Sequence, residues 1–242
     1  MKFLKKAKEI FYHSAVKMDD LTVYLDLDST FVHSYFEEEE IEEIENFLQS
    51  DIDPSLRDRI YKIELVDSQD NSIKGIGEVE SFYMILRPYT DDFLEFLACN
   101  CKEIHIWSAG QFRYVKSVVH VLFNPRNKKL KQLPKNILSR VHCDIGKDYV
   151  LKDLNEHHRD LSKVLIIDDR DDTFQNNIDN GIHIPVYAPD ITIENFNRDD
   201  KTLLELKEWF RSLNRIKPSD IRNVPKDDIF HDYINYIDED DI

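Results

Sequence analysis

The sequence predicts an α/β protein with a central parallel sheet flanked by helices and a small β-hairpin inserted after its first strand. Three observations lead to this class. Short apolar runs alternate with amphipathic segments after residue 87, as strands and helices alternate in parallel-sheet proteins. Several of these runs end in polar residues. Two further strand-like runs, separated by a Gly- and Asn-containing connection, lie between residues 60 and 86.

Composition limits the class of protein. The 242 residues include 32 Lys and Arg and 48 Asp and Glu, a net charge of −16, and 41% hydrophobic residues. Such a chain is apolar enough to fold and too acidic for general affinity for nucleic acids, so we expect no direct nucleic-acid binding. No apolar run approaches the roughly 18 residues of a membrane-spanning helix. We therefore expect a soluble protein. The three cysteines show no paired metal spacing, which favours an intracellular, reducing compartment.

The first half of the chain begins with a basic amphipathic segment, residues 1–18, which we interpret as a lead-in helix lying on the core rather than a membrane anchor. Residues 21–27 form an apolar run typical of a strand buried on both faces. Residues 37–48 place isoleucines and other apolar side chains at helical spacing among seven glutamates, which predicts an amphipathic helix. Residues 60–66 and 79–86 are predicted to pair as the inserted hairpin.

The second half is predicted to alternate helix and strand. Thr90 is expected to N-cap the first helix. The predicted elements are helices at 90–97, 111–123 and 203–213 and strands at 103–107, 164–167 and 182–186. We therefore expect the lead-in at 1–18, one domain at 19–213 with the hairpin at about 60–86, and an acidic tail at 214–242 that either docks on the domain or extends from it.

Polar side chains follow three of the predicted strands. Asp26 and Asp28 end the first strand and, two residues apart, point the same way, while Ser108 and the pair Asp168 and Asp169 end two later strands. Because ligands of parallel sheets bind beyond the carboxyl ends of the strands, these side chains are predicted to meet in one site. Carboxylates held together repel each other unless a cation shares the site, and Mg²⁺ is the cation that oxygen ligands favour.

Each of these features also has an ordinary structural explanation. An Asp-x-Asp pair often serves only in a turn, Ser108 alone is a typical loop serine, and Lys152 alone is a typical surface lysine. Asp168 and Asp169 alone would cap the following helix. Their combination, each at a strand end or in the adjoining loop, predicts a phosphate-transfer site.

Five segments together resemble a known family. They are Asp26 to Ser34, Arg87-Pro88 before a helix, Trp107 to Gly110, Tyr149 to Leu154 and Val164 to Asp169. In this order they resemble the FCP/SCP-type small phosphatases of the RNA polymerase II C-terminal domain (the NIF-like domain), which belong to the haloacid dehalogenase (HAD) superfamily. The resemblance covers about residues 21–209. It implies a HAD-like, Rossmann-like fold, a nuclear or cytoplasmic location, and an Mg²⁺-dependent serine/threonine phosphatase acting on phosphoserine of an extended phosphorylated peptide or protein.

The resemblance also implies the role of each residue. Asp26 would be the nucleophile that carries an aspartyl-phosphate, and Asp28 the general acid and base. The remaining roles are phosphate binding by Thr30, Ser108 and Lys152, Mg²⁺ ligation by Asp26, the Asp28 carbonyl and Asp169, support from Asp168, and substrate contacts by Phe36, Tyr114 and Arg140.

The sequence departs from the family pattern at three places. Serine stands at 108 where the family has threonine, aspartate stands at 169 where the family has asparagine, and the spacing around Leu151 leaves Lys147 as an alternative to Lys152. The extra acid should strengthen Mg²⁺ binding and disfavour a phosphate dianion. Two alternatives therefore stay open: a catalytically weak relative that binds phosphopeptides, and a HAD phosphatase for small molecules.

The charge distribution favours a phosphorylated peptide. Residues 111–152 contain ten basic and two acidic residues in a chain that is otherwise strongly acidic. A positive rim on a negative body steers a phosphorylated substrate toward the site. A nucleic-acid interface at 127–135 is less favoured, since aromatic side chains are not interleaved there.

Overall fold

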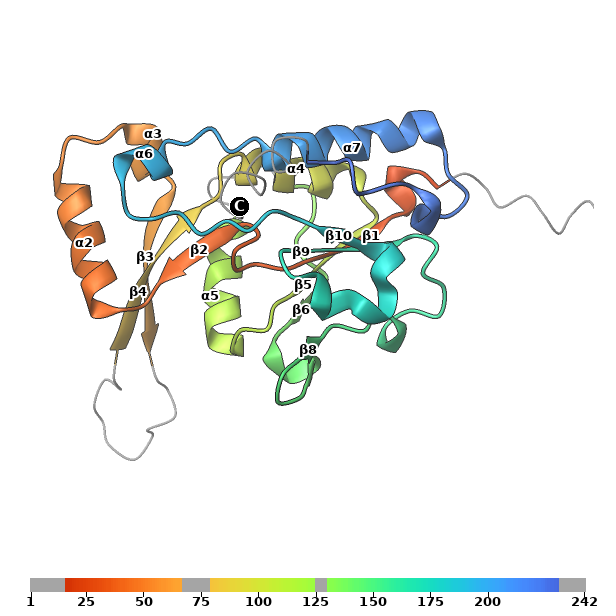
Figure 1. Cartoon of the computed structure of the whole chain (residues 1–242), viewed down its shortest axis with the longest axis horizontal. Coiled ribbons are helices and arrows are strands. Elements are labelled where there is room, and N and C mark those ends of the chain that lie inside the picture. The colour runs from red at the N-terminus through yellow and green to blue at the C-terminus, as the bar shows by residue number, and fades with distance from the viewer. Residues whose placement is uncertain (1–15, 67–78, 125–129, 231–242) are drawn as a thin grey trace, which may run out of the picture.

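The computed structural model describes residues 16–66, 79–124 and 130–230. Its centre is a five-stranded sheet in the order β10-β9-β1-β5-β6, in which all neighbouring strands run parallel. The strands are β1 (Thr22–Leu25), β5 (Glu103–Trp107), β6 (Asn136–Leu138), β9 (Val164–Asp168) and β10 (Gly181–His183). The predicted parallel α/β architecture is confirmed (Figure 1).

Both faces of this sheet are covered, which explains why its central strands are apolar throughout. One face packs against α4 (Thr90–Asn100), α5 (Phe112–Leu122) and α7 (Thr202–Ile216) in the main hydrophobic core. The other face is covered by the 3₁₀ segments η3 (Leu154–Glu156) and η4 (Asp171–Asn180), with Tyr24, Trp107 and Ile166 in a smaller core. In Figure 1, α4 and α7 lie together along one side of the sheet.

The predicted insertion is a three-stranded antiparallel sheet rather than a simple hairpin. Strands β3 (Ile60–Val66) and β4 (Val79–Leu86) pair as expected, and β2 (Val32–Tyr35) adds to the other edge of β4. Helices α2 (Glu38–Gln49), α3 (Pro54–Arg57) and α6 (Ile193–Phe196) close this part of the fold. The sequence did not predict β2, because its four residues include the polar His33 and Ser34 and follow the first strand within a single tight loop.

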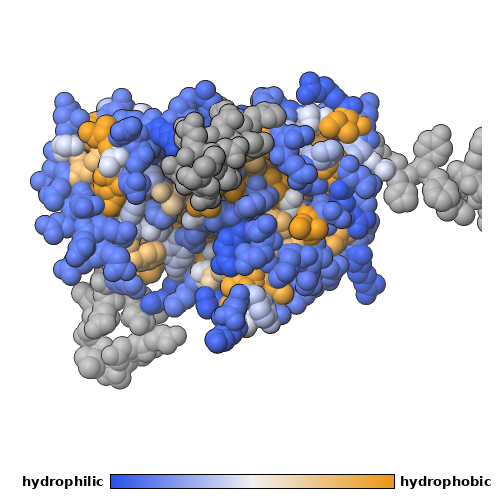
Figure 2. Space-filling view, viewed as in Figure 1, coloured by the Kyte–Doolittle hydropathy of each residue, from blue (hydrophilic) through white to orange (hydrophobic). Residues whose placement is uncertain are grey.

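Smaller elements complete the chain. A short hairpin of β7 (Asp144–Ile145) and β8 (Val150–Leu151) precedes Lys152. The segments η1 (Met18–Asp20), η2 (Arg140–His142) and η5 (Ile221–Asn223) are single 3₁₀ turns. None of the helices within the described residues is long and apolar enough to cross a bilayer. Hydrophilic residues cover most of the face in Figure 2, and hydrophobic residues appear there as separate groups.

The structure corrects two details of the predicted elements. Tyr89, with a φ of 64°, occupies the N-cap of α4, and the Thr90 hydroxyl donates to the Arg87 carbonyl at 2.8 Å. The strand predicted at 182–186 starts one residue earlier and is shorter, since β10 spans Gly181–His183. A Cβ at residue 181 would lie 2.0 Å from the Phe174 ring, so this close approach requires glycine.

The two ends of the chain are only partly described. Residues 1–15 of the predicted lead-in and residues 231–242 of the predicted tail lie outside the described residues. Val16 and Met18 are buried in the main core. At the other end, α7 runs to Ile216, and the chain beyond it buries Ile221 and Val224 in the same core. Residues 217–230 therefore pack against the domain.

Candidate active site

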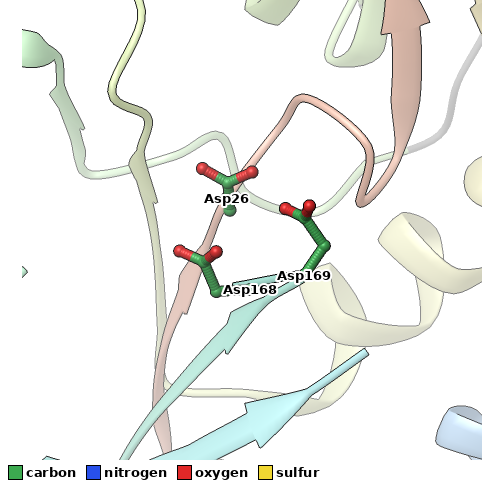
Figure 3. A group of neighbouring side chains, drawn as sticks. All are labelled: Asp26, Asp168 and Asp169. Carbon is green, nitrogen blue, oxygen red and sulfur yellow. The ribbon is translucent and has the colours of Figure 1, made fainter. Parts of the chain in front are cut away.

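Strand register places the first two carboxylates. Leu25 of β1 lies opposite Ile167 of β9, so the next residues, Asp26 and Asp168, leave the sheet side by side. The Asp26 amide donates to the Ile167 carbonyl at 3.0 Å, which continues the ladder to that point. Figure 3 shows the carboxylates of Asp26, Asp168 and Asp169 facing a common space, and one oxygen from each lies within 4.8 Å of the others. The predicted meeting of these acids at the carboxyl edge of the sheet is found.

Lys152 enters the same space and is only 1% exposed. Its ammonium donates to Asp26 Oδ1 at 2.6 Å and to Asp168 Oδ2 at 2.5 Å. Burial by itself lowers the pKa of Lys152, but the two carboxylates reverse that effect and raise it above its ordinary value. Lys147 is exposed in the β7–β8 turn. Of the two lysines that the sequence left open, Lys152 is therefore the one in the site.

The loop that follows β1 is held by backbone hydrogen bonds. The Leu27 carbonyl accepts from the amides of residues 30, 31 and 32 at 2.9 to 3.3 Å. Ser29 adopts a left-handed backbone with a φ of 57°, a conformation that costs about 1 kcal/mol or more for a residue with a Cβ. Its carbonyl accepts from the Tyr187 amide at 2.7 Å. The Arg87 guanidinium donates to the Thr30 carbonyl at 3.2 Å. The strained turn is thus fixed from both sides.

Asp28 lies in this loop and accepts two hydroxyl hydrogen bonds. Tyr114 donates to Oδ1 in a short contact, and Ser108 lies 3.4 Å from Oδ2. Because the Tyr114 proton is engaged, the Ser34 hydroxyl at 2.9 Å donates to the Tyr114 oxygen. Burial raises the pKa of Asp28, and the hydrogen bond from Tyr114 opposes that rise. A buried carboxyl with a raised pKa is suited to carry a proton.

Thr30 and Asp169 complete the cluster. The Thr30 hydroxyl lies 3.4 Å from Asp169 Oδ1, and Thr30 is fully buried. Burial, followed by the neighbouring charge of Asp168, raises the pKa of Asp169. Burial likewise raises the pKa of Asp26, with further contributions from neighbouring carboxylates.

The side chains described at this site carry more acid than base: four aspartates gather around one lysine ammonium. A divalent cation would offset most of this negative charge and favour the ionised form of the carboxylates that hold it. The donor atoms are carboxylate oxygens, which are the ligands that Mg²⁺ prefers. The residues therefore fit Mg²⁺.

The three predicted substrate residues occupy different positions. Phe36 is 45% exposed and stacks on Phe82, with ring centroids 4.7 Å apart. Tyr114 is buried, and its hydroxyl donates to Asp28, so it holds that carboxylate in position. Arg140 is exposed, and its backbone amide donates to the Gly110 carbonyl at 2.9 Å. The structure thus brings Tyr114 into the site, while Phe36 and Arg140 lie around it.

Two supporting residues were not identified from the sequence. Ser34 donates to Tyr114, and Arg87, singled out only as part of a motif, binds the Thr30 carbonyl. No sequence pattern indicates either contact, because each joins segments more than 50 residues apart.

With this geometry established, we compared the chain with known proteins. The model of the NLI interacting factor-like phosphatases matches residues 21–222. The chain belongs to this family. A probable C-terminal domain small phosphatase of Dictyostelium discoideum is 28% identical over 84% of this chain and 53% of its own length. CTD nuclear envelope phosphatase 1B of Danio rerio is 27% identical over 83% of this chain and 69% of its own length.

A solved structure agrees with the fold of this family member. It is an arginine-to-alanine variant of the fission yeast RNA polymerase II CTD phosphatase Fcp1 bound to beryllium fluoride. It matches with a TM-score of 0.52 and 22% identity over 90% of this chain and 56% of that chain. This likeness supports the HAD-type fold expected from the sequence. The chain spans little more than half the length of the Dictyostelium relative and of Fcp1.

Proposed function

We propose that this protein is an Mg²⁺-dependent phosphatase that hydrolyses phosphoserine or phosphothreonine in an extended peptide through an aspartyl-phosphate. The observation that carries the proposal is the buried cluster in which Lys152 contacts both Asp26 and Asp168 beside Asp169. Membership of a phosphatase family supports it.

In the first step, one oxygen of the Asp26 carboxylate attacks phosphorus, and the bond between phosphorus and the substrate hydroxyl oxygen breaks. Asp28 gives its proton to that leaving oxygen. The raised pKa of Asp28 suits this task, and its contacts with Tyr114 and Ser108 fix its orientation. The alcohol leaves and the phosphoryl group remains on Asp26.

In the second step, a water molecule attacks the phosphorus of the aspartyl-phosphate. Asp28, now ionised, takes a proton from that water, and the acyl-phosphate bond breaks to release phosphate. Both carboxyl groups return to their starting states. The Lys152 ammonium and the Thr30 and Ser108 hydroxyls would donate to the transferred phosphoryl oxygens, and their contacts with the carboxylates of the site support these roles.

Mg²⁺ would be held by Asp26, Asp169 and the Asp28 carbonyl and would neutralise charge on the phosphoryl group. Asp168 supports this arrangement, since its Oδ2 accepts from Lys152 and its Oδ1 accepts from the Arg170 amide at 3.0 Å. Lys152 is thereby held between two carboxylates and cannot swing away from Asp26.

A protein substrate is favoured over a small molecule. One human relative is named as a carboxy-terminal domain RNA polymerase II small phosphatase, and the Dictyostelium relative as a probable C-terminal domain small phosphatase. Phosphoserine of an extended peptide such as that domain is therefore the class of substrate we propose. The basic excess of residues 111–152 suits a phosphorylated chain. The location that this implies is the nucleus or cytoplasm.

The test is hydrolysis of a phosphoserine peptide and of p-nitrophenyl phosphate with and without Mg²⁺. We expect Mg²⁺-dependent turnover that Asp26→Asn abolishes, while Asp51→Asn, which alters an exposed aspartate outside the site, retains it. Equal turnover by the wild type and Asp26→Asn would disprove the mechanism. Tight peptide binding without turnover would instead support a binding relative, and turnover of small phosphate esters alone would support a small-molecule phosphatase.

A further inference from the structure

Four large apolar side chains are exposed in two segments that adjoin the site. Phe112 is 53% exposed, Val141 83%, Ile145 37% and Tyr149 42%. Single exposed apolar residues are common on protein surfaces and do not by themselves indicate a binding site. These four belong to segments that contact each other and that lead directly to Ser108 and Lys152. We call them the apolar rim.

Two contacts join the first part of the rim to Ser108. The Arg140 amide donates to the Gly110 carbonyl at 2.9 Å, and the Cys143 thiol lies 3.9 Å from the Ser108 carbonyl. Val141 lies between Arg140 and Cys143 in the chain, and Phe112 follows Gly110 by two residues. Val141 and Phe112 are therefore held beside the loop that carries Ser108.

The second part of the rim lies on the β7–β8 hairpin. Ile145 pairs with Val150, and the Gly146 amide donates to the Tyr149 carbonyl at 3.1 Å. The Tyr149 ring lies directly over Gly146, where an added Cβ would be 2.1 Å from it. Lys152 follows Tyr149 by three residues, a reach of about 10 Å along an extended chain. The hairpin that carries these apolar side chains thus leads directly into the residue that contacts Asp26.

The rim is distinct from Phe36, which packs on Phe82 of the inserted sheet. It also lies within the stretch from 111 to 152, where basic residues outnumber acidic ones by ten to two. The ligand that suits both features is a peptide that is phosphorylated and apolar close to the phosphate. Continuity with the site matters here, because the loops that bear the rim adjoin Ser108 and Lys152 in the chain.

We propose that the apolar rim binds an apolar side chain of the substrate within about three residues of its phosphoserine, as the reach of an extended peptide allows. This inference rests on the proposed function. Burial of an aliphatic side chain against such a surface is favourable because it removes apolar area from water. The rim thereby selects phosphopeptides by the residues that flank the phosphate.

The experiment uses two phosphoserine peptides that are identical except that one carries leucine, and the other serine, at three positions on each side of the phosphoserine. For each enzyme variant, kcat/KM is measured for both peptides and for p-nitrophenyl phosphate, which is too small to reach the rim. We expect the leucine peptide to be favoured roughly tenfold by the wild type. The double variant Phe112→Ser, Val141→Ser should lose most of this preference.

Leu133→Ser is the matched control. Leu133 is 58% exposed, but it precedes β6 and so lies at the opposite edge of the sheet from the site. This variant should keep the full preference for the leucine peptide. Val141→Ser alone should lose part of the preference, and because Val141 is the most exposed of the four, it tests the rim with little risk to folding.

A binding measurement separates this inference from the proposed chemistry. Fluorescence anisotropy with both peptides, on proteins that also carry Asp26→Asn, requires no turnover. Loss of the leucine preference in the rim variant supports the rim even if the wild type hydrolyses nothing. Retention of that preference in the rim variant overturns the inference, even if hydrolysis proceeds as proposed.

Discussion

Two cationic side chains are buried within the part of the chain that the structure describes, and the contrast between them distinguishes a structural centre from a reactive one. Arg87, 2% exposed, donates to the Asp200 carboxylate at 2.8 Å and to the neutral oxygens of Thr30, Pro185 and Thr202. Lys152, 1% exposed, contacts two carboxylates, with two more acids next to them. The charges of Arg87 and Asp200 balance, while those around Lys152 sum to a negative excess.

This difference indicates what each centre does. A buried pair with matched charge and well-placed acceptors stabilises one arrangement of the chain. Here Arg87 joins the strained loop at Thr30 to the start of α7. A buried excess of carboxylates costs stability, and proteins retain such an excess where a bound cation and a reacting group use it. The comparison therefore predicts opposite responses to mutation.

The largest effect is expected for Asp26→Asn. The amide cannot act as the nucleophile, so kcat on a phosphoserine peptide should fall by at least about a thousandfold. The same change removes one of the mutually repelling buried acids, so in Mg²⁺-free buffer Tm should stay equal to that of the wild type or rise. Kinetics and calorimetry on one preparation check both expectations. A marked fall in Tm together with the loss of activity would show that the site is structural.

The next largest effect is expected for Arg87→Met. The change leaves Asp200 without its buried partner and two carbonyl groups without this donor, which typically costs about 3 to 5 kcal/mol. Urea unfolding measures this as a fall in the free energy of unfolding. Arg215→Met, at an exposed arginine of α7, is the control and should change that free energy by less than about 0.5 kcal/mol. A similar small change for Arg87→Met would contradict the structural role of this centre.

The same contrast explains which features the sequence could predict. The acids around Lys152 follow directly on apolar strands, and strand register alone carries Asp26 and Asp168 to the same edge. Lys152 was expected from the family resemblance, with Lys147 as the alternative. Hydrophobic periodicity could not decide between the two lysines, because the strands of the short hairpin β7–β8 have only two residues each.

Other features depend on contacts between distant segments. The resemblance to the family implied a substrate contact for Tyr114, and no local pattern indicated that its hydroxyl donates to Asp28. In the sequence, Arg87 stands out only as the residue before a proline in one of the family segments. Its hydrogen-bond partners lie 57 to 115 residues away. Local patterns cannot report such partners. The hairpin pairing of β3 and β4, by contrast, follows from local alternation.

A smaller effect is expected for Asp169→Asn, which makes the charge excess around Lys152 less extreme. Removal of one carboxylate from the cluster should weaken Mg²⁺ binding by about ten- to a hundredfold. The same removal should raise Tm in Mg²⁺-free buffer, because burial and the charge of Asp168 raise the pKa of this carboxyl. Isothermal titration and thermal unfolding over a series of Mg²⁺ concentrations measure the two effects.

The control for this prediction is Asp172→Asn. Asp172 is exposed and pairs with Arg170 at 2.6 Å, so it lies near the cluster in sequence without being part of it. Its replacement should leave Mg²⁺ affinity unchanged. If Asp172→Asn and Asp169→Asn weakened Mg²⁺ binding equally, the effect would come from general surface charge rather than from ligation at the site.

The smallest effect concerns a third buried group, which is kept neutral rather than charged. His105 stacks on Tyr24 with ring centroids 4.6 Å apart, its Nδ1 accepts from Asn136 at 3.1 Å, and its Nε2 donates to Glu103 at 3.3 Å. Burial lowers the pKa of His105 from its ordinary value of 6.5. The unfolded chain therefore binds a proton at a higher pH than the folded chain does.

It follows that the free energy of unfolding contributed by His105 is fully present above pH 6.5 and declines as the pH falls below that value. Urea unfolding from about pH 7.5 to about pH 5.5 measures this slope across the histidine range. His105→Gln should flatten the slope, whereas His120→Gln, at an exposed position of α5, should leave it unchanged. An identical slope in wild type and His105→Gln would mean that His105 protonates as readily in the folded protein as in the unfolded chain. The stack on Tyr24 would then impose no cost on a charged imidazole.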